Sequence, residues 1–222
     1  MIIIQVLYSS ITQKKTNVHI VDNMIDYVYE RRRNMQKKID LRIQRTYKLL
    51  TDALIELLKE KDFDSMTVGE ICEKAMIRRA TFYKHFADKY ELFAFVIREI
   101  QDDFESRIDM NAYEKSHPQT FYAMVINYTL DFVEENIDMV KSILSSNSDK
   151  LQTVLSDEIE SEIRMQLKQN QKDGVVLPAN PELIAAMITG ALIYGIKRWI
   201  QPNSNITKKE IITTCKMLAN NL

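Results

Sequence analysis

Residues 67–86, TVGEICEKAMIRRATFYKHF, place the strongest constraint on how this chain folds. Thr67 stands three residues before Glu70, the spacing of a capping box, in which each residue satisfies a free backbone N–H of the other. Apolar residues follow at helical spacing and make one apolar face: Val68, Ile71, Cys72 and Ala75. This helix has about two turns, which is too few for stability in isolation. Neighbouring helices must therefore support it.

A second short helix is expected, after a tight turn, from Arg78 or Arg79 to His85. Its start is unusual, because positive charge there opposes the helix dipole. Phe82 and Phe86, four residues apart, can face inward. Polar, basic and aromatic residues are left for the outer faces: Thr81, Tyr83, Lys84 and His85. The pattern is typical of a recognition helix in a DNA major groove. The alternative is a solvated face on an ordinary helical hairpin.

The composition favours helices as the building material of the whole chain. The 222 residues include only four Gly and four Pro, with 45% hydrophobic and 27% charged residues, which describes a globular protein made of long helices. The net charge is −1, so any nucleic-acid binding must come from local charge. Basic residues gather in the first half and acidic residues later, which suggests a basic reading head on an acidic body.

Residues 45–96 resemble the DNA-binding domain of TetR-family transcriptional regulators. The matching residues are Ala53, Phe63, Thr67, Ile71, Ala75, the run TFYKHF at 81–86, Asp88, Lys89, Glu91 and Leu92. Two positions depart from the family pattern: Met76 stands where Gly is usual, and Arg78 where a small capping Ser is usual. A methionine would be strained if position 76 needs a positive φ. The turn is therefore expected to differ slightly from that of the family.

The resemblance implies an all-α protein with two domains. Residues 35–88 would form a three-helix helix-turn-helix DNA-binding domain, and residues 89–222 a helical dimerisation and effector-binding domain. The run GALIYGIKRWI at 190–200 is similar to the C-terminal domain of Gram-positive (Firmicutes-type) members. The implied function is that of a cytoplasmic repressor, which binds a palindromic operator as a homodimer and is released by a small-molecule effector. The alternative is a co-activator or interaction protein with the same fold and reduced DNA binding.

Candidate DNA contacts lie in and around the second short helix. The candidates for contacts to base edges are Arg78, Arg79, Thr81 and His85. The candidates for contacts to phosphates are Arg45, Thr46, Thr67, Tyr83, Lys84 and Lys89.

The last two helices, expected over 181–200 and from 207 onward, are the most apolar part of the body. They resemble the pair that forms a four-helix dimer interface in the family, the alternative being a purely intramolecular core. The candidate interface residues are Ile188, Ala191, Leu192, Ile211, Cys215 and Leu218. Candidates for an effector pocket, each of them more often plain core, are Phe121, Met124, Tyr128, Met165, Met187, Tyr194 and Trp199.

Residues 1–34 call for a separate interpretation. The apolar start MIIIQVLYSS lacks the basic region and cleavage site of a signal peptide and is too short to span a membrane. Codons for residues 30–35 can contain a ribosome-binding sequence just before Met35. We therefore expect translation to start at Met35 and residues 1–34 to be a mis-assigned leader. The alternative is a basic arm at 31–38 that contacts DNA.

No pattern in the sequence indicates an enzyme, a cofactor or a metal site. Cys72 and Cys215 fall on apolar faces far apart, which is typical of buried thiols. The three histidines form no metal-ligand spacing with them, and no phosphate loop or nucleophile elbow is found. The expected partners are double-stranded DNA, a second copy of the chain and a small-molecule effector, with no membrane.

Overall fold

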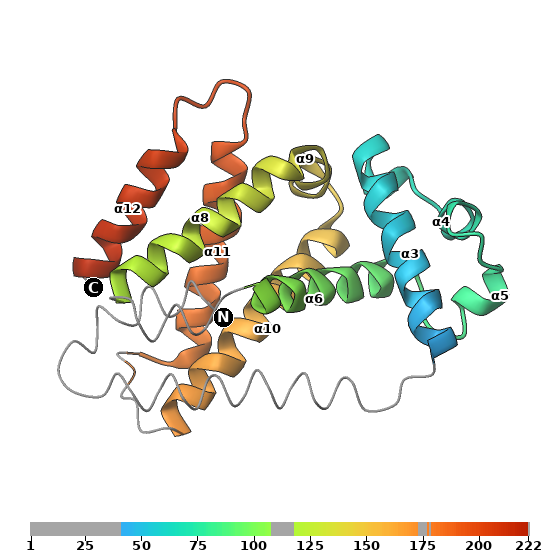
Figure 1. The fold of residues 1–222 in the computed structure, drawn as a ribbon, viewed down its shortest axis with the longest axis horizontal. Helices are drawn as coiled ribbons and strands as arrows, with labels where there is room; N and C mark the ends of the chain where they lie inside the picture. Colours follow the sequence, from blue (N-terminus) through green and yellow to red (C-terminus); the bar gives the residue numbers. More distant parts are fainter. Residues whose placement is uncertain (1–40, 108–117, 173–176, 178, 222) are drawn as a thin grey trace. The chain divides into compact units, whose positions relative to one another are not determined.

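The computed structural model of the protein describes residues 41–107, 118–172, 177 and 179–221. Every regular element in these residues is a helix (Figure 1), which confirms the expected all-α class. None of these helices is both long and apolar enough to cross a bilayer. The expectations for a leader at 1–34 and a basic arm at 31–38 lie outside the described residues.

The described elements occur in the following order along the chain. They are α3 (Leu41–Glu60), the 3₁₀ turn η1 (Phe63–Ser65), α4 (Val68–Lys74), α5 (Arg79–Phe82), α6 (Lys89–Arg107), α8 (Pro118–Glu135), α9 (Ile137–Ser145), α10 (Asp149–Lys172), α11 (Pro181–Trp199) and α12 (Lys208–Asn221).

The chain divides into two compact units, which are described separately. In its described residues, the first unit spans 41–105 and 136–158 and contains the helix-turn-helix elements, most of α6, all of α9 and the start of α10. The second unit takes its described residues from 106–135 and 159–222 and contains α8, the rest of α10, α11 and α12. The expected domain boundary after residue 88 stays a prediction.

The core of the first unit is formed by leucine and phenylalanine side chains from successive helices. One face of α3 is buried, through Leu50, Ala53, Leu54, Leu57 and Leu58. Three phenylalanines, Phe63, Phe82 and Phe93, are fully buried beside it. Each such ring contributes about 1.5–3 kcal/mol when it leaves water. This burial supplies the support that the short helices α4 and α5 need.

The start of α4 and the turn that follows the helix each have the local feature that the sequence predicted. Thr67 and Glu70 form the capping box: the Thr67 hydroxyl accepts from the Glu70 N–H at 3.2 Å, and the Glu70 carboxylate accepts from the Thr67 N–H at 2.8 Å. Met76 has a φ of 55°, which is the left-handed region, and its side chain is 93% exposed. The expected strain at Met76 therefore has a backbone cause.

The second helix is shorter than expected. It was predicted to reach His85, but α5 ends at Phe82. The N–H groups of Lys84 and His85 donate to carbonyls only three residues back, so the chain tightens into turns before α6. The expected helix end at His85 is therefore wrong by about one turn.

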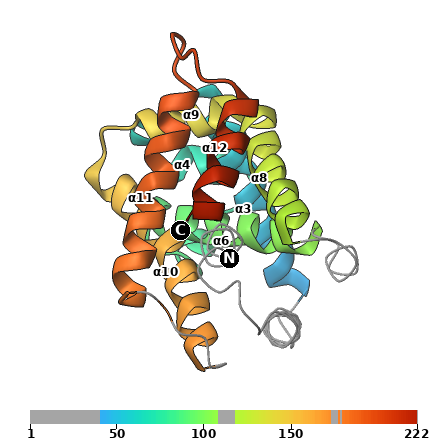
Figure 2. The ribbon, with the colours of Figure 1, turned by 90° about the vertical axis from the view of Figure 1, so that its left-hand side faces the viewer.

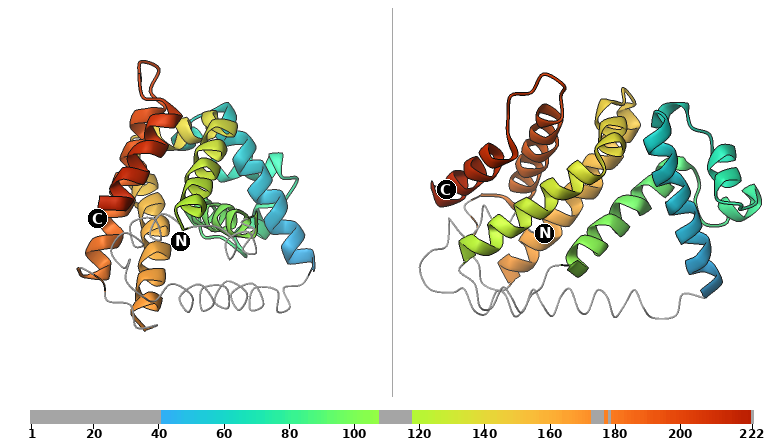
Figure 3. Two further views of the ribbon diagram at one scale, coloured as in Figure 1. Left: turned by 60° about the vertical axis from the view of Figure 1, so that its left-hand side comes forward. Right: turned by 45° about the horizontal axis from the view of Figure 1, so that its top comes forward.

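The helices of the second unit, drawn as ribbons in Figures 2 and 3, have a core of their own. Side chains from α10 and α11 make this core, namely Ile163, Leu167, Ala185 and Ile188. Helix α12 packs on α8, where the Lys208 ammonium forms ion pairs with Asp131 and Glu134. These ion pairs raise the pKa of Lys208. Glu210 caps the start of α12 by accepting from the Thr207 N–H at 2.7 Å.

Replacing Met76 by Gly should stabilise the protein by about 1 kcal/mol. A left-handed backbone costs a residue with a Cβ roughly 1–2 kcal/mol, while the freedom of glycine in the unfolded chain removes part of that gain. The exposed Met76 side chain buries little surface, so its loss costs little. Urea unfolding at neutral pH measures the difference.

Glu73→Gly is the matched control. Glu73 is exposed and lies within α4, where glycine costs about 1 kcal/mol through lost helix propensity. The two variants should therefore change stability in opposite directions. A Met76→Gly protein that is less stable than the parent would contradict the strain at position 76.

Candidate DNA-binding site

Helix α5 and the turn after it present polar and basic side chains on the side opposite the core. Phe82 is fully buried and Phe86 is 5% exposed. Between and before them, Arg78, Arg79, Tyr83 and Lys84 are exposed, while Thr81 and His85 are half-buried. The two phenylalanines therefore orient the segment, and the predicted inward and outward faces are confirmed.

Ion pairs separate the basic residues of the first unit into two groups. Lys61, Lys74 and Lys150 each contact a carboxylate, with Lys74 2.6 Å from Glu60 and Lys150 2.7 Å from Asp88. In the described part of the chain, no carboxylate pairs with Arg45, Arg78, Arg79 or Lys84. Uncompensated positive charge therefore gathers around α5, although the chain as a whole is close to neutral.

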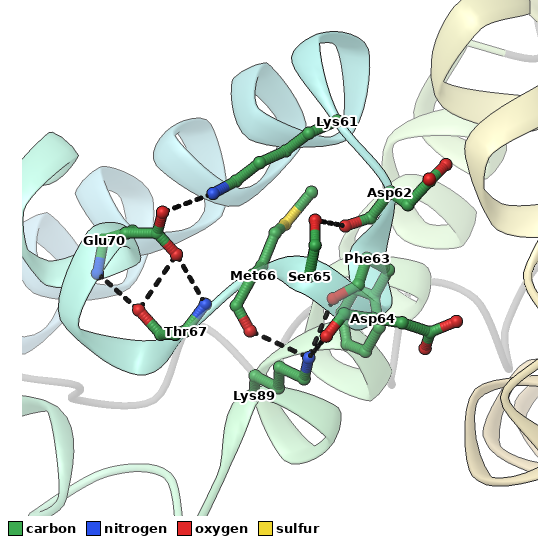
Figure 4. Close-up of polar contacts among 9 residues, drawn as sticks. All are labelled: Lys61, Asp62, Phe63, Asp64, Ser65, Met66, Thr67, Glu70 and Lys89. Atoms are coloured by element: carbon green, nitrogen blue, oxygen red, sulfur yellow. Dashed lines mark hydrogen bonds and ion pairs between the residues drawn. The ribbon is translucent and has the colours of Figure 1, made fainter.

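Glu70, in the first turn of α4, neutralises the positive charge of Lys61. Its carboxylate pairs with the Lys61 ammonium and also accepts from the N–H and hydroxyl of Thr67 (Figure 4). These hydrogen bonds, the one from Lys61 foremost, lower the pKa of Glu70 to about 2. The Thr67 side chain is thus already part of the capping box, but it remains exposed and accessible to a phosphate.

Lys89 has a structural function that the sequence did not indicate. Its ammonium donates to the carbonyls of Phe63, Asp64 and Met66 at 2.8, 3.1 and 2.8 Å (Figure 4). It also lies 4.6 Å from the centre of the Phe63 ring. An ammonium has three N–H donors, and all three are used here. The expected phosphate contact of Lys89 stays a prediction, and it would require breaking these bonds.

Two further candidates are partly occupied by contacts within the unit. The His85 ring packs edge-on against the Tyr47 ring, with 5.2 Å between ring centres. The Thr46 hydroxyl donates to the Arg42 carbonyl at 2.9 Å. Tyr47 was not among the candidate site residues, and no local signal in the sequence links it to His85, because the two residues belong to different segments of the chain. The candidates whose charged groups are most available are therefore Arg45, Arg78, Arg79 and Lys84.

Arg78 occupies the N-cap position of α5 without capping the helix. Its backbone is extended, with φ −69° and ψ 140°, and its side chain makes no capping hydrogen bond. A guanidinium has only donors, whereas the free N–H groups of a helix start need an acceptor. The fold therefore gains nothing from arginine at this position, which favours a role in binding.

Two family models match the chain. Residues 50–96 match the model of bacterial regulatory proteins of the tetR family, and residues 119–221 match a model of a transcriptional regulator C-terminal region. The chain belongs to the TetR family. A TetR-family chain is a DNA-binding transcriptional regulator, which agrees with the helix-turn-helix around α4 and α5. The expected Firmicutes type of the C-terminal domain stays a prediction.

Relatives resemble this TetR-family chain over different lengths. An uncharacterized HTH-type transcriptional regulator of Bacillus subtilis, YxbF, is 43% identical over 67 residues, which is 30% of this chain but only 18% of that protein. The nucleoid occlusion factor SlmA of Photobacterium profundum is 22% identical over 163 residues, covering 69% of this chain and 83% of that protein.

Solved structures share the fold. The transcriptional regulator FadR of Bacillus subtilis, in complex with stearoyl-CoA, gives a TM-score of 0.56 at 16% identity, covering 79% of this chain and 99% of that one. Lin0861 of Listeria innocua gives 0.56 at 21% identity, covering 82% and 93%. At these identities the likeness shows the fold alone.

One residue expected at a dimer interface belongs to the core of the second unit. Ile188 is 4% exposed and packs against Ile163, Leu167 and Ala185. This corrects its assignment, because a side chain buried within one chain leaves almost no surface for a partner. Leu192 is half-buried against the same core. The other candidates stay predictions, with side chains that are exposed or half-buried (Ala191, Ile211) or outside the described side chains (Cys215, Leu218).

The exposed face of α11 corrects part of the expected effector pocket. Met187 is 67% exposed and Tyr194 74%, so neither lines a pocket inside the second unit. Leu183, which the sequence analysis did not single out, is 56% exposed on the same face. Its position four residues before Met187 is the signal that was available. The other pocket candidates are exposed to 40% (Met165), half-buried (Tyr128, Trp199) or outside the described side chains (Phe121, Met124).

Arg78→Ser should raise the free energy of unfolding by about 0.5–1 kcal/mol and weaken DNA binding. Serine supplies the acceptor that the start of α5 needs, and the substitution removes an exposed cation. Urea unfolding and titration with a mixed-sequence DNA duplex at about 50 mM salt, on the same preparation, measure both effects.

Arg45→Ser is the control for the two effects. It also removes an exposed cation, but from within α3, where serine caps nothing. It should weaken DNA binding without stabilising the fold. Unchanged DNA binding by the Arg78 variant would show that this arginine is not part of the interface.

Proposed function

We propose that the protein is a homodimeric repressor, which binds a palindromic operator through α5 and is released by a small-molecule effector. The observation that carries the proposal is the uncompensated charge around α5. Arg78, Arg79 and Lys84 are exposed and in no ion pair within the described residues, on a segment oriented by buried phenylalanines. The charge of such a segment is complementary to that of the DNA phosphates, and its size fits a major groove.

Two copies are needed for a specific site. One recognition helix contacts only a few base pairs, and attraction to phosphates adds affinity that is largely independent of sequence. Two copies related by a two-fold axis would contact half-sites roughly 34–36 Å apart, or a multiple of that. A palindromic operator is the DNA counterpart of such a dimer.

The exposed face of α11 supports a dimer. Leu183, Met187 and Tyr194 lie on one side of the helix and are each more than half exposed. At Gly190, within the same face, a Cβ would meet nothing within 4 Å. Large apolar side chains gathered on one face favour contact with a partner. We therefore assign Leu183, Met187 and Tyr194 to the dimer interface in place of the buried Ile188.

A small-molecule effector is the proposed signal for release. FadR, whose fold this chain shares, has been solved with stearoyl-CoA. In this chain, the half-buried aromatic residues Tyr128 and Trp199 of the second unit remain candidates to line such a site. The effector would act by binding better to the form of the dimer that does not fit DNA.

Selection from a pool of random DNA duplexes tests the proposal and should enrich one palindromic sequence. Arg79→Ala should then lower affinity for that sequence by about 1–3 kcal/mol, the range for loss of a bidentate contact to a base. Fluorescence titration at one stated salt concentration measures the change.

Lys59→Ala is the matched control, because Lys59 is an exposed cation of the same unit at the far end of α3. It should leave affinity for the selected duplex nearly unchanged. Enrichment of no sequence would instead favour the co-activator or interaction protein with reduced DNA binding. Enrichment combined with full affinity of the Arg79 variant would remove Arg79 from the interface.

Met187→Asp should convert the dimer to a monomer without unfolding it. A carboxylate in the centre of an apolar contact would lose hydration when the two copies meet. Sedimentation velocity measures the oligomeric state, and circular dichroism checks the helical content. Thr153→Asp, an exposed residue of α10 in the first unit, should remain dimeric. A parent chain that sediments as a monomer at every concentration would contradict the dimer itself.

A further inference from the structure

Gly69 lies in a helix where glycine is unfavourable. Helix α4 has only seven residues, Val68–Lys74, and a glycine within it costs about as much propensity as one hydrogen bond contributes. Gly69 has no positive φ that would demand glycine. What position 69 does offer, without a side chain, is space beside the helix.

The guanidinium of Arg79 fills that room. A Cβ built on Gly69 would stand 2.1 Å from Nη2 of Arg79, 2.9 Å from its Cζ and 3.2 Å from its Nε. The first two distances are too short for a methyl group and the third is tighter than an ordinary contact, so the guanidinium lies directly against the bare Cα of Gly69. The glycines of α11 differ, since a Cβ at Gly190 or Gly195 would meet nothing within 4 Å.

Nearby chemistry agrees with this position of the guanidinium. Burial raises the pKa of the Cys72 thiol, and the positive charge of Arg79 acts in the opposite direction. Cys72 lies one turn after Gly69 in α4, so the charge of Arg79 is felt along that side of the helix. No carboxylate holds the guanidinium there within the described residues. The contact is therefore a matter of shape, and it depends on the missing side chain at position 69.

We propose that Gly69 is a specificity-determining position, because its bare Cα forms a seat that orders the Arg79 guanidinium for contact with a base. This inference rests on the proposed DNA-reading function of α5. Gly69 is a positioning residue that acts through Arg79. A bidentate contact to guanine needs the planar guanidinium in one orientation. An arginine side chain that is not already ordered in the free protein must be ordered when DNA binds. The conformational entropy lost in that step weakens binding.

An alanine at position 69 would remove the seat without destroying the fold. The atoms that its Cβ would meet are at the far end of a flexible side chain, so Arg79 can move aside. Alanine also has the higher helix propensity. Gly69→Ala should therefore fold as well as the parent and change only where the guanidinium lies.

A double-mutant cycle in the full chain tests the proposal. Affinity for the selected duplex is measured at one salt concentration for the parent, Gly69→Ala, Arg79→Ala and the double variant. Gly69→Ala should weaken binding about three- to tenfold, which is the cost of ordering one long side chain expressed as an affinity ratio. It should also relax the preference for the base that Arg79→Ala relaxes. In the Arg79→Ala background, the same glycine substitution should have no further effect.

Gly195→Ala is the matched control, because it adds the same methyl group to an exposed helical glycine with nothing in its way. It should leave the DNA preference unchanged. Thermal unfolding of all variants confirms that each one folds.

The possible failures can be told apart. If the parent chain enriches no duplex, the proposed function fails before the cycle begins. If the parent binds and Gly69→Ala keeps its affinity and base preference, the seat has no function. If Gly69→Ala weakens binding equally with and without Arg79, the methyl group acts on the DNA directly, and the role through Arg79 is wrong.

Discussion

The candidate DNA-binding site depends on the burial of Phe82 and Phe86, because the segment around α5 is too short to be stable by itself. Helix α5 has four residues, Arg79–Phe82. A helix this short has too few internal hydrogen bonds to be stable alone in water. Phe82 and Phe86 pack against each other and, through Phe86, against Tyr47 and Phe95. Because the apolar side of the segment is fixed in this way, its polar side must face solvent. The orientation of the proposed DNA-reading surface is thus a consequence of core packing.

The basic residues of the same unit have two different roles. Lys61 supports the cap of α4 through Glu70, and Lys89 ties the start of α6 to the turn at 63–66. Their donors are used, so these lysines stabilise the scaffold. Arg78, Arg79 and Lys84 are in no ion pair within the described residues, and they create a local positive field suited to the proposed binding of DNA. A chain with a net charge of −1 can therefore bind a polyanion at one place.

Local signals predicted the helices well, and contacts between distant residues limited the rest. The capping boxes at Thr67 and Thr207 act within one turn, so the starts of α4 and α12 could be predicted from sequence alone. The end of α5 could not, because the bonds that tighten the chain after Phe82 accompany the packing of Phe86. The structural role of Lys89 could not be predicted for the same reason: its acceptors lie on a turn far back in the chain, and no residue near position 89 indicates them.

The sequence by itself determined the helical class, the family motif and the segment that carries the exposed basic side chains. These three features follow from the spacing of residues within a few positions of one another. Only the tertiary structure decided which of two sequence neighbours, Met187 and Ile188, faces solvent and which is core. It alone placed the Arg79 guanidinium on the bare Cα of Gly69. The sequence shows which residues of a helix are apolar or charged. It does not show which residue each of them contacts, because many of those partners come from segments that meet only when the chain is folded.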